Sequence, residues 1–337
     1  MDDAGTGATL RAVPGIRIKG VDRMKVTCYA SGVIGTSWAT NFALKGCEVT
    51  VYDLNRGLLA HAKQMVQDNL YHLARQDCFS FDYIPDIMSR IQYTTDPEAA
   101  VAEAEFIQES GPEKLELKRQ FAALFDRCAP ADCIVASSTS GLRISDITAE
   151  SANPGRYIGA HPFNPPHLIP LVEITWGPET RQDVLDRAVA FYRAMGKEPI
   201  VLQKEKIGFV ANRLSHAVLR EVMSLVSEGV CSPEDADRAL TYGPGLRWAA
   251  VGQVMIAELG TQGGVRAGTE RFTPLNESIF RDLENRTTVP ENWADVAEAG
   301  VIAEKRDLPD WIGHTTEDLA AFRDNVLVEL LKLHRKL

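Results

Sequence analysis

The chain has 337 residues, of which 45% are hydrophobic and 24% charged, an ordinary composition for a globular protein with room for two domains. A formal net charge of -10 argues against a nucleic-acid partner or an anionic membrane surface, because both attract clustered Lys and Arg. Six cysteines without CxxC spacing, and no secretory leader, favour a reducing cytoplasm with buried free thiols. No Cys/His set has the spacing of a zinc site, so we expect no metal.

The N-terminal part of the sequence alternates strands with helices. Residues 1–23, rich in Gly, Ala and charge, are expected to form a flexible extension. A strand at 25–29, a helix at 34–44 and a strand at 48–53 form one βαβ unit, and an inserted helical pair follows at 56–75 and 83–90. Further strands are predicted at 106–108, 133–137, 157–160, 171–175 and 199–202, with helices at 113–128 and 179–195. This alternation predicts an α/β fold with a mostly parallel sheet covered on both faces.

The pattern changes to helices alone in the C-terminal part. Helices are predicted at 210–228 and 232–240, where Ser232 can cap and Pro233 suits the first turn. A last helix at 316–336 carries a stripe that is either core or a partner-facing surface: Leu319, Phe322, Val326, Leu330 and Leu333. We therefore expect a sheet domain over 24–205 and an all-helical domain over 206–337, through which a homodimer could form.

A glycine turn, Ala30-Ser31-Gly32-Val33-Ile34-Gly35, lies between the first predicted strand and helix. In this context backbone N–H groups and the positive helix end face a pyrophosphate. Gly32 and Gly35 occupy the second and third glycine positions of GxGxxG, and Ala30 replaces the first, which a methyl group permits if that residue keeps a negative φ. Asp53, at the end of the second strand, can accept both ribose hydroxyls and would repel a 2′-phosphate. The turn therefore predicts a dinucleotide site, and Asp53 predicts that this site favours NAD over NADP.

One histidine and one carboxylate lie where strand geometry could couple them. His161 precedes a proline-rich loop and Glu173 follows it, and their spacing of 12 residues (173 minus 161) suits neighbouring strands. Oxidation of a secondary alcohol needs a base for the hydroxyl proton while hydride leaves the same carbon, and neutral imidazole suits that task near pH 7. A carboxylate on the far nitrogen would fix the tautomer and stabilise the imidazolium. The pair predicts hydride chemistry with His161 as base and Glu173 as its partner.

At these motifs the sequence resembles the 3-hydroxyacyl-CoA dehydrogenase family. The resemblance is carried by Ala30–Gly35, Gln108–Glu109 with Pro112–Lys118, Ser137–Ser140, His161–Pro165 and Gly208–Arg213. It implies a Rossmann-type first domain, a helical dimerising second domain and NAD-linked oxidation at C3. It makes His161 the base and Glu173 its partner. It also implies polar groups around the reacting oxygen and the cofactor amide at Ser140, Asn164 and Asn212, with Glu109 lining the same cleft as a cofactor contact.

Departures from the acyl-CoA pattern bear on the substrate. Ile207 stands where the family usually has Pro before Gly-Phe, and the usual Gly-Lys-Lys-Thr-Gly-Glu-Gly-Phe-Tyr segment is missing. The helical ending, Gly243–Ala249 and His161-Pro162 together resemble the free-acid branch, which includes L-gulonate 3-dehydrogenase (lambda-crystallin) and L-carnitine dehydrogenase. We therefore expect a small free 3-hydroxy acid as substrate.

A free carboxylate needs a cationic or hydrogen-bonding receiver, for which Arg247 beside Trp248 is a candidate. The alternative for Arg247 is an ion pair at a domain or subunit interface. For the chain as a whole, a 3-hydroxyacyl-CoA dehydrogenase and a non-catalytic NAD-binding or structural protein remain as alternatives. The latter would be indicated by loss of the His/Glu pair, and both members are present.

Overall fold

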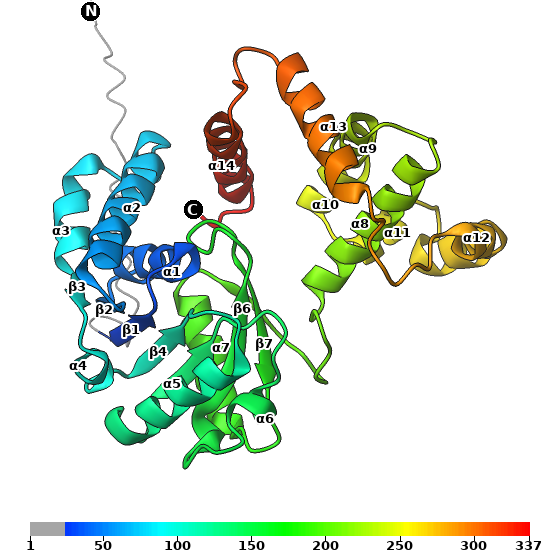
Figure 1. The fold of residues 1–337 in the computed structure, drawn as a ribbon. Helices are drawn as coiled ribbons and strands as arrows, with labels where there is room; N and C mark the ends of the chain where they lie inside the picture. The colour runs from blue at the N-terminus through cyan, green and yellow to red at the C-terminus, as the bar shows by residue number, and fades with distance from the viewer. Residues whose placement is uncertain (1–23) are drawn as a thin grey trace, which may run out of the picture. The chain divides into compact units, whose positions relative to one another are not determined.

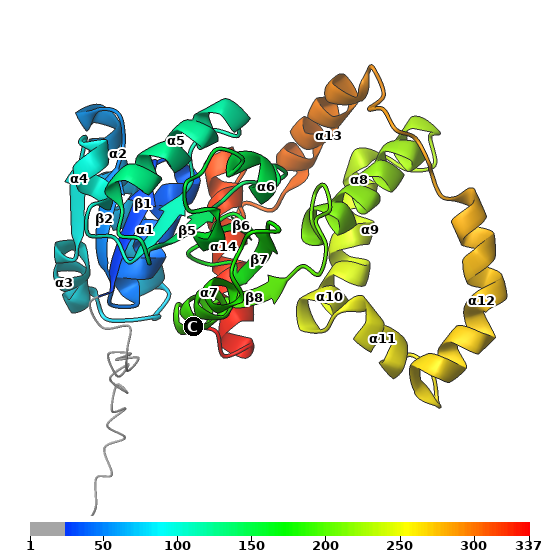
Figure 2. The same ribbon diagram turned by 90° about the horizontal axis from the view of Figure 1, so that it is seen from below.

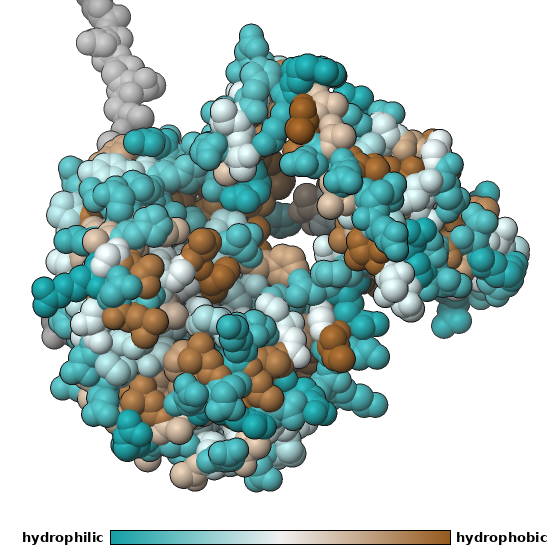
Figure 3. Space-filling model, in the orientation of Figure 1, coloured by the Kyte–Doolittle hydropathy of each residue, from teal (hydrophilic) through white to brown (hydrophobic). Residues whose placement is uncertain are grey.

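The computed structural model describes residues 24–337, so the expected flexible extension over 1–23 lies outside the described residues. The described chain divides into two compact units. The first comprises the residues up to Phe209 together with Leu327–Leu337, and the second comprises Val210–Val326. Hydrophilic residues cover most of the visible surface of each unit, with apolar residues in small groups (Figure 3). Over the described residues, no helix is both long enough and apolar enough to cross a membrane.

The first unit is built on an eight-stranded sheet in the order β3-β2-β1-β4-β5-β6-β7-β8 (Figure 1). Its strands are β1 (Lys25–Tyr29), β2 (Glu48–Tyr52), β3 (Ile91–Thr94), β4 (Phe106–Glu109), β5 (Ile134–Ser137), β6 (Tyr157–Pro162), β7 (Leu171–Trp176) and β8 (Glu198–Val201). Neighbouring strands run parallel except for β6 and β7. The strand order reverses between β1 and β4, and in such sheets ligands bind at the carboxyl ends of the strands at this switch point. The predicted mostly parallel, Rossmann-type sheet is confirmed.

Helices cover both faces of the sheet, as Figure 2 shows from a second direction. One face packs against α1 (Val33–Leu44), α2 (Arg56–Arg75), α3 (Ile84–Ser89) and α7 (Gln182–Ala194). The other packs against α4 (Pro97–Val101), α5 (Leu115–Cys128) and α6 (Ile144–Ile147). Because side chains alternate along a strand, Phe106 joins the first core and its neighbour Ile107 the second.

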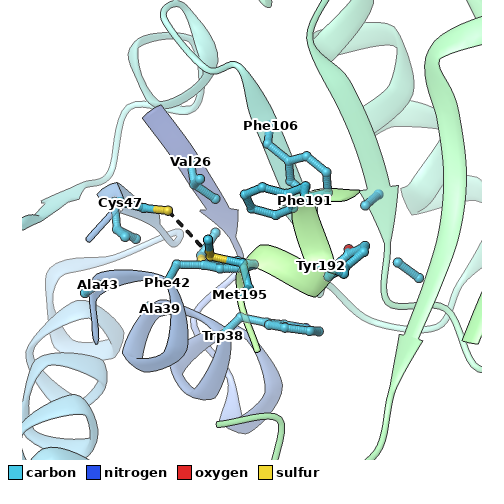
Figure 4. Close-up of a cluster of buried hydrophobic side chains, with 14 of the residues drawn as sticks. Val26, Trp38, Ala39, Phe42, Ala43, Cys47, Phe106, Phe191, Tyr192 and Met195 are labelled. Carbon is cyan, nitrogen blue, oxygen red and sulfur yellow. Dashed lines mark hydrogen bonds between the residues drawn. The ribbon is translucent and has the colours of Figure 1, made fainter. Parts of the chain in front are cut away.

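Aromatic packing fixes α1 and α7 over the sheet (Figure 4). The rings of Trp38 and Phe42, one turn apart on α1, stack with centroids 5.1 Å apart. Phe191 of α7 stacks on Phe106 of β4 at 4.2 Å. Such pairs add to the free energy gained by burying large apolar surfaces. The packing holds the N-terminal end of α1 at the carboxyl edge of the sheet, where β1 runs into the glycine turn.

The second unit is helical. It contains α8 (Ala211–Ser227), α9 (Pro233–Leu240), the π-helical segment η3 (Thr241–Gly245), α10 (Leu246–Ala250), α11 (Gln253–Leu259), α12 (Gly264–Asp282) and α13 (Trp293–Asp307). Ser232 caps α9 as predicted, because its hydroxyl oxygen accepts a hydrogen bond from the Asp235 N–H at 3.1 Å. Within this unit α9 contacts α8 and α13, and α11 contacts α12. The predicted all-helical character of the C-terminal part is confirmed.

The last helix, α14 (Thr316–Leu333), begins in the second unit and ends in the first. Its Val328 and Leu331 are buried in a cluster with Leu73 of α2 and Leu168 of the β6–β7 loop. The expected helical domain over 206–337 therefore needs correction, because residues 327–337 pack on the sheet unit. The predicted stripe is not part of the buried core: Leu333 is 80% and Val326 41% exposed, so of its two alternatives the partner-facing surface stays a prediction.

Candidate active site

His161 and Glu173 face each other across the β6–β7 pair. The antiparallel register sets the two residues directly opposite, which brings their side chains onto one face of the sheet. Nδ1 of His161 lies 3.0 Å from Oε2 of Glu173, and both side chains are buried. A carboxylate at Nδ1 favours the tautomer that carries its proton there, which leaves Nε2 free to accept one. The geometry is thus that of a base held by a buried acid.

Two aromatic rings enclose the imidazole. The centroids of Phe163 and Phe209 lie 5.7 and 5.4 Å from the centroid of the His161 ring. Phe209 is itself buried, with a φ of 49°. Apolar walls lower the local dielectric, which strengthens the attraction between an imidazolium and the carboxylate behind it. Asn164, which follows Phe163, is exposed at the start of the loop.

The glycine turn leaves the N-terminus of α1 accessible. Gly32 is the N-cap residue of α1, and no side chain caps the helix there. A Cβ on Gly32 would meet no atom within 4 Å, whereas one on Gly35 would lie 1.9 Å from the carbonyl oxygen of Ala30. Gly35 is therefore required by the turn itself, and Gly32 leaves room for a ligand to approach the first-turn N–H groups. This arrangement fits a pyrophosphate.

The conformation of Ala30 differs from the expected one. Its φ is 83°, so the expectation of a negative φ was wrong. The Ala30 N–H donates to the carbonyl of Tyr52 at 3.0 Å, which ties the turn to the end of β2. The chain then turns within two residues to enter α1. This turn requires a positive φ at Ala30, a conformation that glycine usually supplies. After the turn, α1 begins with Val33 and Ile34. Val33 is exposed, and Ile34 packs on the core.

Asp53 follows β2 and turns toward the glycine turn. Its Oδ2 accepts hydrogen bonds from the N–H and the hydroxyl of Ser31 at 2.7 and 2.6 Å. Its Oδ1 accepts one from the Leu54 N–H at 2.7 Å. Two carboxylate oxygens offer about four acceptor positions. The three hydrogen bonds named here leave about one position, on Oδ1, for a further hydroxyl donor. The carboxylate and the open end of α1 lie at the same edge of the sheet, and together they fit a dinucleotide.

Glu109 lies in a buried ion pair at the end of β4. Nζ of Lys118 donates to its two oxygens at 2.8 and 3.0 Å. The Gly111 N–H and the Ser137 hydroxyl also donate to it, at 2.6 and 2.5 Å. These contacts fix the ends of β4 and β5 to each other, so direct contact between Glu109 and the cofactor stays a prediction. Sequence reasoning gave Lys118 no role, although it belongs to the quoted Pro112–Lys118 motif.

Glu113 holds the loop that carries Ser140. One of its oxygens, Oε1, accepts the Thr139 hydroxyl at 2.5 Å and the N–H groups of Ser140 and Gly141 at 2.9 and 3.1 Å. The Ser140 side chain itself is exposed after β5. Glu113 was also overlooked in the sequence, where an acid just before a helix is usually taken for a capping residue.

Three further predicted residues belong to the second unit. Asn212 lies in the first turn of α8, where its carbonyl oxygen is 2.7 Å from Nδ1 of His216. Arg247 is exposed on α10, and the indole N–H of Trp248 donates to Oε1 of Gln253 at 2.7 Å. Their parts in a shared site stay predictions. Among residues 24–337, no group of three or more His, Cys, Asp or Glu side chains could hold a metal ion.

Two family models match the chain in succession. The one described as "3-hydroxyacyl-CoA dehydrogenase, NAD binding domain" matches residues 25–206, and "3-hydroxyacyl-CoA dehydrogenase, C-terminal domain" matches residues 208–305. The L-carnitine dehydrogenase of Streptomyces griseus is 38% identical over 320 residues, which cover 92% of this chain and 90% of that protein. A 3-hydroxyacyl-CoA dehydrogenase of Gibberella moniliformis is 36% identical, with 93% and 95% covered.

Two solved structures have a similar fold. A 5-formyl-3-hydroxy-2-methylpyridine 4-carboxylic acid 5-dehydrogenase matches with a TM-score of 0.75 and 26% identity, and covers 93% of this chain and 98% of its own. The 3-hydroxybutyryl-CoA dehydrogenase of Escherichia coli matches with a TM-score of 0.66 and 26% identity, over 85% of this chain and 59% of its own.

The sheet, the open glycine turn and these relatives define an NAD-dependent oxidoreductase that acts on a CH–OH group. The chain belongs to the 3-hydroxyacyl-CoA dehydrogenase family.

Proposed function

We propose that the protein oxidises the 3-hydroxyl of a small free 3-hydroxy acid, similar to carnitine or gulonate, to the 3-keto acid. The observation that carries the proposal is the buried contact between His161 and Glu173 at the carboxyl edge of β6. It is supported by curated relatives named L-carnitine dehydrogenase that match over nine tenths of the chain.

The chemistry follows from the two nitrogens of His161. NAD, when bound, supplies the acceptor for the hydride that leaves C3. Nε2 of His161 takes the hydroxyl proton, and Glu173 stabilises the imidazolium that results. A positioned base of this kind contributes a factor of ~10² to 10⁴ in rate. Ser140, Asn164 and Asn212 are proposed to orient the C3 oxygen, and in the reverse direction to polarise it.

The cofactor contacts in this proposal come from the turn and from β2. The first-turn N–H groups behind Ala30–Gly35 would bind the pyrophosphate, and Asp53 would accept the ribose hydroxyls. Glu109, which is held by Lys118 and by the Ser137 hydroxyl, is proposed to line the same cleft as a cofactor contact.

A CoA thioester is the second candidate substrate, because a relative of similar identity is named 3-hydroxyacyl-CoA dehydrogenase. A free acid needs a receiver for its carboxylate, and we propose Arg247, with Trp248 beside it, for that part. If this is correct, Arg247→Ala raises the KM for the acid far more than the KM for NAD. Equal effects on both constants would exclude the role.

A substrate panel tests the proposed function. L-Carnitine, L-gulonate, 3-hydroxybutyrate and 3-hydroxybutyryl-CoA are each incubated with enzyme and NAD, and NADH is followed by its absorbance. We expect turnover of at least one free acid at a higher kcat/KM than that of the thioester. Turnover of the thioester alone would establish the second candidate. NAD binding without any turnover would favour a non-catalytic protein.

We also propose that two copies of the chain form a homodimer through the helical unit. The support is a row of exposed apolar side chains on α12, which includes Phe272, Leu275, Ile279 and Phe280. Phe280 is 68% exposed and Leu275 57%, and an apolar row of this kind on one helix is typical of a subunit interface. The small-molecule substrate and the second copy are the two partners proposed for this chain.

A further inference from the structure

The loop between β6 and β7 begins two residues after His161 and contains three prolines, Pro165, Pro166 and Pro170. Its backbone carbonyls still need donors because they are largely withdrawn from water. The N–H groups of Leu168 and Ile169 donate to Pro165, at 3.0 and 2.9 Å. The Glu198 N–H donates to Pro170 at 2.8 Å. In the sequence, the carbonyls of Pro166 and Ile169 lie between those of Pro165 and Pro170.

Lys197 supplies the donor for both carbonyls. It lies just before β8 and is 4% exposed. Its Nζ donates to the carbonyl oxygen of Pro166 and, at 3.4 Å, to that of Ile169. Nζ also lies 5.5 Å from the centroid of the Trp38 ring. A lysine is rarely buried to this degree. Both of these hydrogen bonds from the amine go to the backbone of one loop.

The donor capacity of Lys197 does not depend on its charge. Burial, with the nearby Lys45 ammonium, lowers the pKa of Lys197 to about 7. A neutral amine keeps two N–H bonds and an ammonium has three, so either form can serve two carbonyls. The loop is therefore held on both sides of that pKa.

The opposite side of the loop has its own attachments. The Ser37 hydroxyl oxygen accepts the His167 N–H at 2.7 Å, and the same hydroxyl lies 2.7 Å from Nδ1 of His167. Leu168 is buried against α2 and α14. Residues 166–169 are fixed in this way, and the loop residues that precede Pro165 are Phe163 and Asn164. These two residues carry the ring beside His161 and the exposed amide of Asn164.

We propose that Lys197 is a positioning residue, which holds the 163–170 loop so that Asn164 meets the substrate oxygen beside His161. This inference rests on the proposed function, because Asn164 has a task only if that oxygen binds there. It assigns Lys197 no contact with substrate or cofactor. Misplacement of a reacting group by about 1 Å can cost ~10²-fold in rate, so loss of the amine should be visible in kcat.

The test compares Lys197→Met with Lys63→Met, a control on the exposed face of α2. NADH binding is titrated by fluorescence, and kcat is expressed per NADH-binding site, so that misfolded enzyme does not count. We expect Lys197→Met to lower kcat at least tenfold and to leave the Kd for NADH within twofold. Amides 167–169 should also exchange hydrogen faster in this variant. The control should match the wild type in every measurement.

A lower melting temperature with unchanged kcat per site would show that Lys197 is merely structural, and would overturn the inference. If Lys197→Met gives no NADH-binding protein, Lys197→Arg is measured in the same way. Arginine at this position keeps a donor but places it differently. We therefore expect the same fall in kcat with intact NADH binding, and a wild-type kcat overturns the inference.

His161→Gln is assayed in the same experiment as the Lys197 variants. Retention of kcat by His161→Gln would refute the proposed function, whereas its loss together with normal kcat in Lys197→Met would refute the present inference alone.

Discussion

Gly32 and Gly35 are glycines for different physical reasons. At Gly35 a methyl group would lie 1.9 Å from a backbone oxygen, so the turn itself excludes it. At Gly32 the backbone has a φ of -64° and the position of a Cβ is open, so the protein alone tolerates a side chain. What Gly32 provides is close approach of a ligand to the N–H groups of α1. A substitution at Gly32 should therefore affect ligand binding, whereas one at Gly35 should affect folding.

We predict that Gly32→Ala leaves thermal stability unchanged and raises the Kd for NAD by about tenfold or more, equivalent to about 1.4 kcal/mol. Gly35→Ala should lower the free energy of unfolding by about 1–3 kcal/mol, as overpacked sites do. Calorimetry measures both quantities for each variant. Normal NAD affinity in Gly32→Ala would contradict the proposed cofactor site.

The cysteines provide a second prediction for single residues. Burial raises the pKa of Cys47 and that of Cys133 to about 12, and raises the pKa of Cys28 further. A raised pKa keeps a thiol protonated, and the thiolate is the reactive form. At pH 8 a disulfide reagent should therefore modify at most three of the six thiols of the native protein, and all six in denaturant. Rapid native labelling of Cys28, Cys47 or Cys133, located by mass spectrometry, would contradict this packing.

At the scale of elements, α14 joins the end of the chain to the sheet unit. Leu331 is buried with Leu73 and Leu168, whereas Leu333, two residues on, is 80% exposed. Leu331→Ala should lower the free energy of unfolding by about 2–3 kcal/mol through lost burial and the cavity left behind. Leu333→Ala, the matched control, should change it by less than about 0.5 kcal/mol. Urea denaturation compares the two, and equal effects would place the buried face of α14 elsewhere.

Elements with a long or strongly patterned sequence could be predicted, and those that depend on tertiary contacts could not. The helix expected at 56–75 is α2 (Arg56–Arg75), because its apolar residues recur with helical period over five turns. The four-residue edge strand β3 (Ile91–Thr94) escaped prediction, because so short a segment has no readable period. The buried face of α14 could not be predicted, because its apolar residues lie around much of the helix. Contact with Leu73 and Leu168 decides which of them are buried.

The same distinction applies to the site. His161 and Glu173 could be paired from the sequence because a proline-rich loop joins the two neighbouring strands that carry them; that these strands run antiparallel was not predicted. The contact between Glu109 and Lys118 could not, since it depends on how α5 packs beside β4. The backbone of Ala30 could not either, because its positive φ follows from the tie to Tyr52.

At the scale of the whole molecule, the proposed homodimer can be tested by mass. We expect light scattering in solution to give about twice the chain mass of 37.1 kDa. Leu275→Asp combined with Ile279→Asp places two charges in the exposed apolar row of α12, and should yield a monomer because burying unpaired carboxylates is costly. A single-chain mass for the wild type at micromolar concentration would contradict the dimer.

The central claim is that His161, held by Glu173, removes the proton of the substrate hydroxyl. The most direct measurement is kcat of His161→Gln with the best acid of the panel, at saturating NAD and with NADH binding measured on the same sample. We predict a fall of ~10² to 10⁴ in kcat with NADH affinity preserved. A kcat equal to that of the wild type, in a variant that still binds NADH, would contradict the account.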